Sequence, residues 1–89
     1  MKPKKINRMG MSLDEWTHES CIATIGEGEN WATIYSITSK EKGRGHGTEL
    51  LIEMKKYYET QGKTFGSSVA LSGAMKHLLT KLNIPEYAQ

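Results

Sequence analysis

The pattern of hydrophobic and polar positions predicts two neighbouring β-strands in the first half of the chain. Residues 20–25 alternate between two faces, both of them fairly apolar. Residues 31–39 are rich in β-branched and aromatic side chains, which favours a strand more strongly. Residues 26–30, which separate these runs, contain two glycines and an asparagine and are typical of a turn. We therefore expect an antiparallel hairpin.

Apolar residues recur with the period of an α-helix in the second half of the chain. In residues 48–61 they share one face, and Gly62 ends the pattern. A second helix is expected over residues 73–83, with Ser72 as its cap and Pro85 after its end. The apolar faces of the two helices consist of Leu50, Leu51, Met54, Tyr57, Tyr58, Met75, Leu78, Leu79 and Leu82.

The segment between the two helices, residues 64–71, predicts a third strand that is weakened by a glycine and two serines. Because a helix connects it to residues 31–39, we expect the two strands to be parallel, with a right-handed crossover. The predicted order is ββαβα, an α/β fold with a mixed sheet.

The chain begins with a basic segment that is expected to be irregular. Residues 1–11 are predicted to be a flexible basic arm, and residues 12–89 a single domain. The arm is either a solvated end or a contact for an acidic partner. After it, Ser12 and Glu15 fit a capping box, which predicts a short helical turn over residues 13–17. The basic side chains of the arm are Lys2, Lys4, Lys5 and Arg8.

Composition indicates a small protein of a reducing compartment. A net charge of +2 on 89 residues is too small to indicate nucleic-acid binding. The single cysteine, Cys21, excludes an internal disulfide. His18 and Cys21 have a metal-like spacing, but no second pair of ligands follows, so no metal site is predicted. No apolar run approaches the roughly 20 residues of a membrane span, and the N-terminus lacks the apolar part of a secretory signal. We expect a cytoplasmic protein.

The most informative segment is residues 42–48, which read Lys-Gly-Arg-Gly-His-Gly-Thr between a predicted strand and a predicted helix. Three glycines at alternate positions leave the backbone N–H groups uncovered. The helix that follows adds its own unpaired amides and its positive dipole end. The segment therefore predicts a binding site for a phosphate or diphosphate, which we call the anion seat.

Two familiar phosphate loops do not fit this chain. A P-loop is excluded because Gly62, Lys63 and Thr64 follow a helix, and Tyr57 stands where the first glycine belongs. The dinucleotide fingerprint also fails, because its third glycine is replaced by Thr48 or Leu50, depending on where the count begins.

A third type of phosphate-binding loop matches this segment. Lys42 to Gly47 resembles the Arg/Gln-x-x-Gly-x-Gly/Ala signature of the GNAT acyltransferase superfamily, and residues 37–51 look like its motif A. Residues 80–84 resemble the end of its motif B, so the resemblance covers about residues 20–87. It implies a minimal GNAT-like three-layer sandwich, similar to trimmed members that phages encode. The family's N-terminal helices and last two strands have no counterpart here.

The resemblance implies acetyl-CoA as co-substrate. Ile37, Thr38 and Ser39 match the strand whose backbone pairs with the pantetheine arm, and Lys42 takes the Arg/Gln position. The remaining residues of the loop correspond to the diphosphate nest, namely Gly43, Arg44, Gly45, His46, Gly47 and Thr48.

Candidate catalytic residues match the family less well. Trp31 occupies the position of the family's basic glutamate. Glu29, two residues earlier, is therefore the candidate general base. Leu79 occupies the position of the family's general-acid tyrosine. Tyr87 and the Ser72 hydroxyl are therefore the candidates for the general acid.

The resemblance implies an N-acyltransferase that moves an acetyl group to a primary amine. Because the parts that normally build the acceptor groove are missing, a macromolecular acceptor, above all a protein, or a second copy of the chain is expected to complete the site. The alternative is a GNAT-derived binding module with weak catalysis or none. Only the basic arm favours a nucleic-acid partner.

Overall fold

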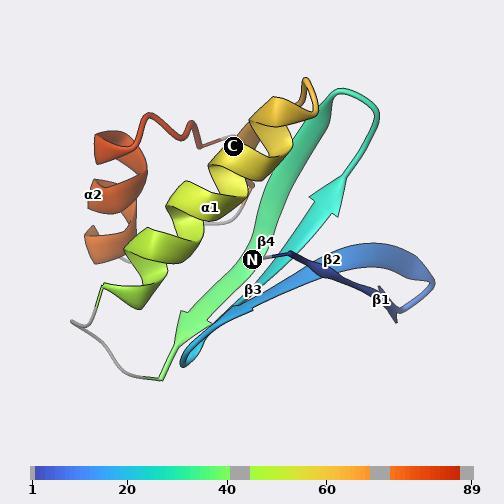
Figure 1. Ribbon diagram of the computed structural model, residues 1–89, viewed down its shortest axis with the longest axis horizontal. Helices are drawn as coiled ribbons and strands as arrows, with labels where there is room; N and C mark the ends of the chain where they lie inside the picture. Colours follow the sequence, from blue (N-terminus) through green and yellow to red (C-terminus); the bar gives the residue numbers. More distant parts are fainter. Residues whose placement is uncertain (1, 41–44, 69–72, 87–89) are drawn as a thin grey trace.

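The computed structural model describes residues 2–40, 45–68 and 73–86, which form one five-stranded sheet and two helices (Figure 1). The elements are β1 (Lys4–Arg8), β2 (Met11–His18), β3 (Cys21–Glu27), β4 (Trp31–Ser39), α1 (His46–Thr60), β5 (Thr64–Ser67) and α2 (Gly73–Lys81). The strands lie in the order β1-β2-β3-β4-β5; the first four are antiparallel, and β5 is parallel to β4. The prediction of an α/β fold with a mixed sheet is confirmed.

The order of elements is ββββαβα, so the prediction of ββαβα is wrong. The segment expected to be irregular contains β1, and residues 13–17 belong to β2 rather than to a helical turn. A tight hairpin joins the two strands through Met9 and Gly10, whose φ values of 51° and 79° suit a type I′ turn. Pairing of β2 with both neighbours, and burial of Trp16, outweigh the local capping-box signal.

A β-bulge in β4 changes which side chains face the core. Across the register of β3 and β4, Ala23 pairs with Ile37, and Ile25 pairs with Ile34. Ala23 and Ile25 are two residues apart and share a face, so Ile34 and Ile37 also share a face although they are three apart. Tyr35 is the additional residue that has no partner in this register.

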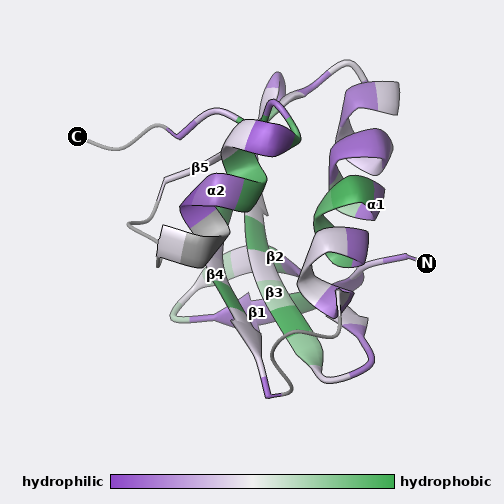
Figure 2. Ribbon diagram, turned by 90° about the vertical axis from the view of Figure 1, so that its left-hand side faces the viewer, coloured by the Kyte–Doolittle hydropathy of each residue, from purple (hydrophilic) through white to green (hydrophobic). Residues whose placement is uncertain are grey.

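The core lies on one face of the sheet, beneath both helices (Figures 1 and 2). Leu79 of α2 belongs to the same buried cluster as the inner residues of α1, whereas Leu13 on the opposite face does not. The described residues therefore form two layers, and the prediction of three layers is wrong for them. The core cluster contains Trp16, Cys21, Ala23, Ile25, Ala32, Ile34, Leu50, Leu51, Met54, Tyr58, Phe65, Leu79 and Ile84.

The helices lie close to their predicted positions. α1 begins two residues before the predicted start and ends just before Gly62, whose φ of 80° is left-handed. The predicted cap Ser72, the side chain of Met75 and the last residues of the predicted third strand lie outside the described part of the chain. Within the described residues, no helix has the length and apolar character needed to cross a bilayer.

Candidate functional site

The junction between β4 and α1 contains the described part of the predicted anion seat. Gly45 precedes α1 with φ 76° and ψ 4°, a left-handed conformation that favours glycine. Within the described residues no side chain caps the helix, and the Glu49 N–H donates to the Gly45 carbonyl at 3.0 Å. The N–H groups of His46, Gly47 and Thr48 precede this bond and therefore lack an acceptor within the helix. They form the positive end of α1, where an anion is stabilised.

Near the same end of the sheet, the described pairing of β4 with β5 reaches Ile34. β5 pairs with residues 31–34 of β4, and beyond this pairing the Ser68 N–H donates to the Ile34 carbonyl at 3.3 Å. β4 continues for five more residues, and in the described part of the chain its register with β5 contains no partner for Ile37 or Thr38. A strand edge of this kind is where another extended chain can pair.

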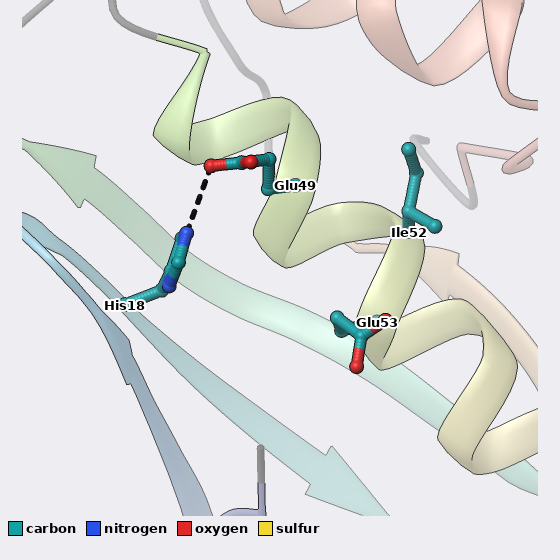
Figure 3. Close-up of a pocket in the computed structure, with 4 residues that line it drawn as sticks. All are labelled: His18, Glu49, Ile52 and Glu53. Atoms are coloured by element: carbon teal, nitrogen blue, oxygen red, sulfur yellow. Dashed lines mark hydrogen bonds and ion pairs between the residues drawn. The ribbon is translucent and has the colours of Figure 1, made fainter.

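A shallow hollow beside the first turns of α1 is lined by His18, Glu49, Ile52 and Glu53 (Figure 3). His18 is the last residue of β2, and a hydrogen bond of 2.9 Å joins its Nε2 to Glu49 Oε1. The His18 ring meets the His46 ring edge to face, with 5.6 Å between centroids. His46 Nδ1 is buried and has no hydrogen-bond partner among the residues that the structure describes. Two imidazoles and a carboxylate thus lie at the positive end of α1.

The Tyr58 hydroxyl, near the other end of α1, is the centre of a buried hydrogen-bond chain. Trp16 Nε1 donates to the Tyr58 hydroxyl at 3.0 Å, and this hydroxyl donates to Asp14 Oδ2 at 2.6 Å. All three side chains are buried. Burial, and then the Asp14 carboxyl, raise the pKa of Tyr58, which keeps its hydroxyl a proton donor.

Asp14 also belongs to a cluster of charged groups. Lys5 Nζ lies 2.6 Å from Asp14 Oδ1 and 2.8 Å from Glu27 Oε2, and Lys63 pairs with the other oxygen of Glu27. Burial raises the pKa of Asp14. Hydrogen bonds with Asp14, Lys5 and Lys63 lower the pKa of Glu27 to about 2 against the opposing effect of burial. The cluster joins β1, β2, β3 and the segment after α1.

Glu29, the predicted general base, lies away from the anion seat. It is exposed in the turn that precedes β4. The turn that holds it comes before Trp31, and the six strand positions from Trp31 to Ile37 span about 20 Å at 3.3 Å per residue. The structure therefore brings Gly45, His46, Gly47 and Thr48 to the end of β4 that holds Ile37, Thr38 and Ser39, and it does not bring Glu29 there.

The structure describes some of the other residues singled out for the site, and the rest lie outside the described part of the chain. Leu79, which takes the place of the family's acid, is buried in the core. Ser39 pairs with Cys21 at the end of β4. The predicted residues that lie outside the described part of the chain are Lys42, Gly43, Arg44, Ser72 and Tyr87.

The described residues contain no group of three or more His, Cys, Asp and Glu side chains arranged to hold a metal ion. His18 and Cys21 are partners in the register of β2 and β3. Cys21 is fully buried, and this burial raises the pKa of its thiol.

Sequence analysis missed the contacts of β2 with α1. Asp14, Trp16 and His18 lie at every second position and share the face of β2 that meets the helix. Trp16 also meets the edge of the Tyr57 ring, with 5.2 Å between centroids. The alternation of these positions is a signal for a strand. The capping box of Ser12 and Glu15 favoured a helical turn instead.

Comparisons with protein-family models, with curated proteins and with solved structures found no match to this chain. The GNAT resemblance rests on the motifs in residues 37–51 and 80–84 and stays a prediction.

Proposed function

We propose that the chain binds acetyl-CoA where β4 meets α1 and transfers the acetyl group to a primary amine of a protein or other macromolecule. The observation that carries this proposal is that two features meet at one end of the sheet. One is a helix N-terminus that no described side chain caps, and the other is a strand whose pairing with the described residues of β5 ends at Ile34. CoA has a diphosphate that suits the first feature and an extended pantetheine arm that suits the second.

The diphosphate is placed on the amides at the start of α1. Gly45 turns the chain so that the N–H groups of His46, Gly47 and Thr48 form the positive end of the helix. Lys42 and Arg44, which lie in the same loop by sequence, add positive charge to this proposed seat.

The pantetheine arm is placed along β4 beyond Ile34, as an added strand. Alternate residues of a strand direct their N–H and C=O groups to the same side, so the backbone around Ile37 and Thr38 can bond the amides of the arm. An N–H of this segment can also donate to the thioester carbonyl and stabilise the charge that develops on its oxygen.

The proposed reaction is direct attack of the amine on the thioester. A C–N bond forms, the C–S bond breaks, and the CoA thiolate leaves. The proton lost by the amine passes to water or to the thiolate. A thiol with an ordinary pKa of about 8.5 is a fair leaving group, so no side-chain acid is essential.

The arrangement of the chain supports a minimal form of the GNAT fold. The glycine loop follows the fourth strand of the sheet here, and in the GNAT family it also lies between the fourth strand and a helix. The strand after the helix is parallel to the fourth strand, as the crossover requires.

Calorimetric titration with acetyl-CoA tests the proposal, with Gly45→Glu and Gly10→Glu as a matched pair. Both glycines have a left-handed φ, and an added Cβ has open space at each, so the strain is similar. Only Gly45 lies at the proposed anion site. We expect wild type and Gly10→Glu to bind, and Gly45→Glu to bind at least about tenfold more weakly because its carboxylate repels the diphosphate. No binding by wild type at about millimolar ligand, or equal affinities of all three proteins, contradicts the proposal.

A second candidate function is a CoA-binding interaction module without catalysis. It is favoured by the position of Glu29, which is exposed in the turn before Trp31, at the opposite end of β4 from Ser39. A thiol-release assay with protein acceptors separates the two candidates. Acceptor-dependent release of CoA supports the transferase, and acetyl-CoA binding without release supports the module.

A further inference from the structure

We propose that two copies of the chain pack together through the face of the sheet opposite the two helices, which we call the open face. In the described part of the chain, both helices lie over the core face of the sheet (Figure 1). No described helix or strand packs against the open face. The inference goes beyond acetyl-CoA binding and does not depend on it.

Exposed apolar side chains gather on the open face. Met11, Ile22 and Trp31 lie an odd number of positions from core residues of their own strands, so they point away from the helices. They are three of the five large apolar side chains that are exposed in the described part of the chain. A cluster of exposed apolar side chains marks an interaction surface.

Two aromatic rings of the open face lie directly against the backbone. A Cβ atom at Gly26 would collide with the Tyr35 ring, and a Cβ atom at Gly28 would collide with the Trp31 ring. Ile25, the neighbour of Gly26, faces the core, so the Tyr35 ring lies on the open face. Aromatic side chains held in this way lose little entropy on binding and are typical anchors of protein interfaces.

The charges of the open face favour a second copy over a charged partner. On this face β3 and β4 carry no charged side chain, and β1 and β2 carry Lys4, Arg8 and Glu15. Lys4 pairs with Glu15 in the register, and Arg8 Nη2 lies 3.5 Å from Glu15 Oε2. A nucleic acid or an acidic lipid surface requires a cluster of one sign. A second copy brings the same uncharged centre, with both signs at the edge.

The open face has the area that a dimer requires. Its strands contain four to nine residues each and cover about 500 Å² at about 3.3 Å per residue and about 4.8 Å between strands. Two copies therefore cover about 1,000 Å², which is the area that a specific interface needs. A chain of 89 residues also has a thin core, so covering an apolar face stabilises it. We expect two sheets packed face to face, with a dissociation constant in the micromolar range.

Sedimentation equilibrium of wild type, Ile22→Lys and Ile52→Lys tests the proposal at chain concentrations from about 1 to about 500 µM. Ile22 is 40% exposed on the open face, and Ile52 is 45% exposed on α1, so the two variants form a matched pair. We expect the mass of wild type and of Ile52→Lys to rise from one chain to two. Ile22→Lys should associate at least about tenfold more weakly, because its ammonium group would be buried in the interface.

The fluorescence of Trp31 reports which surface associates. The chain has two tryptophans, and Trp16 is fully buried within one copy. We therefore expect the emission of Trp31 to move to shorter wavelength as the mass rises, and Ile22→Lys to show this shift only at higher concentration. Circular dichroism checks that the variants fold. If Ile22→Lys does not fold, the wild-type emission still decides.

The proposal is overturned if wild type remains a single chain at about 500 µM, or if Ile52→Lys weakens association as much as Ile22→Lys. Association that leaves the Trp31 emission unchanged also overturns it, because another surface is then the interface. A single chain whose Trp31 emission shifts with neutral lipid vesicles or with a single-stranded oligonucleotide has a different occupant on the open face, which contradicts the proposal as well. None of these results involves acetyl-CoA, so the proposed function is decided separately by its own titration.

Discussion

The Tyr58 hydroxyl donates a hydrogen bond of 2.6 Å to Asp14, and this contact joins α1 to β2 across 44 positions of the chain. Four residues after Asp14, on the same face of β2, His18 contacts Glu49 near the start of the same helix. β2 therefore holds α1 near both ends, and the position of the proposed anion site depends on a buried contact at the other end of the helix.

Replacing Tyr58 with phenylalanine should destabilise the fold. The change leaves the buried Trp16 N–H without its acceptor and removes a donor from Asp14. The expected loss in the free energy of unfolding is about 1–3 kcal/mol, measured by urea denaturation. Tyr57→Phe is the control, because Tyr57 contacts Trp16 through its ring. Equal stabilities of the two variants would contradict the role of the Tyr58 hydroxyl.

Glu27 should contribute to the acid sensitivity of the fold. Its pKa is about 2 in the folded protein and ordinarily 4.5, so between these pH values the unfolded chain binds more protons. Stability is therefore lost as the pH falls from about 4.5 towards about 2. Asp14 acts in the opposite direction, because its raised pKa makes its contribution fall as the pH rises.

We expect Glu27→Gln to unfold more easily near neutral pH but to lose stability less steeply in the acid range than wild type. Urea midpoints measured across that range check this slope. If Glu27→Gln and wild type have parallel pH profiles, the lowered pKa of Glu27 is refuted.

The bulge in β4 can be tested through two neighbouring positions. A regular strand would place Ser36 on the face of Ile34, but the bulge places Ile37 there instead. Ile37 packs against the core, and Ser36 is exposed. Ile37→Asp should therefore cost at least about 2 kcal/mol of unfolding free energy, and Ser36→Asp about 0.5 kcal/mol or less. The reverse ranking in urea denaturation would show that the register is regular.

Much of the fold was predictable where local pattern and tertiary packing agree. β3, β4 and α1 were predicted because their apolar residues follow the period of the element that they form. β1 and β2 were not, because Lys4–Arg8 contains one apolar residue, Ile6, and the core face of β2 includes a carboxylate. Asp14 is compatible with burial only through Lys5 and Tyr58, and such distant partners are not visible in a local pattern.

The site was predictable in part for the same reason. The alternating glycines predicted a phosphate-binding loop before α1, and Gly45, in its described part, has the left-handed φ that glycine adopts readily. The point to which the described pairing of β4 with β5 extends depends on the register, and the contact of His18 with Glu49 spans 31 positions, so neither could be read from a window of sequence. Glu29 was chosen by counting along an extended strand, and the turn before β4 separates it from the junction with α1.

The most direct test of the central claim is amide hydrogen exchange with and without saturating acetyl-CoA. The account predicts slower exchange on binding in residues 46–48 and at whichever of the Ile37 and Thr38 N–H groups points away from β3, because these N–H groups would bond the diphosphate and the pantetheine arm. Exchange around Asp14, at the other end of α1, should change much less. Protection that appears elsewhere and spares the junction of β4 and α1 would contradict the account.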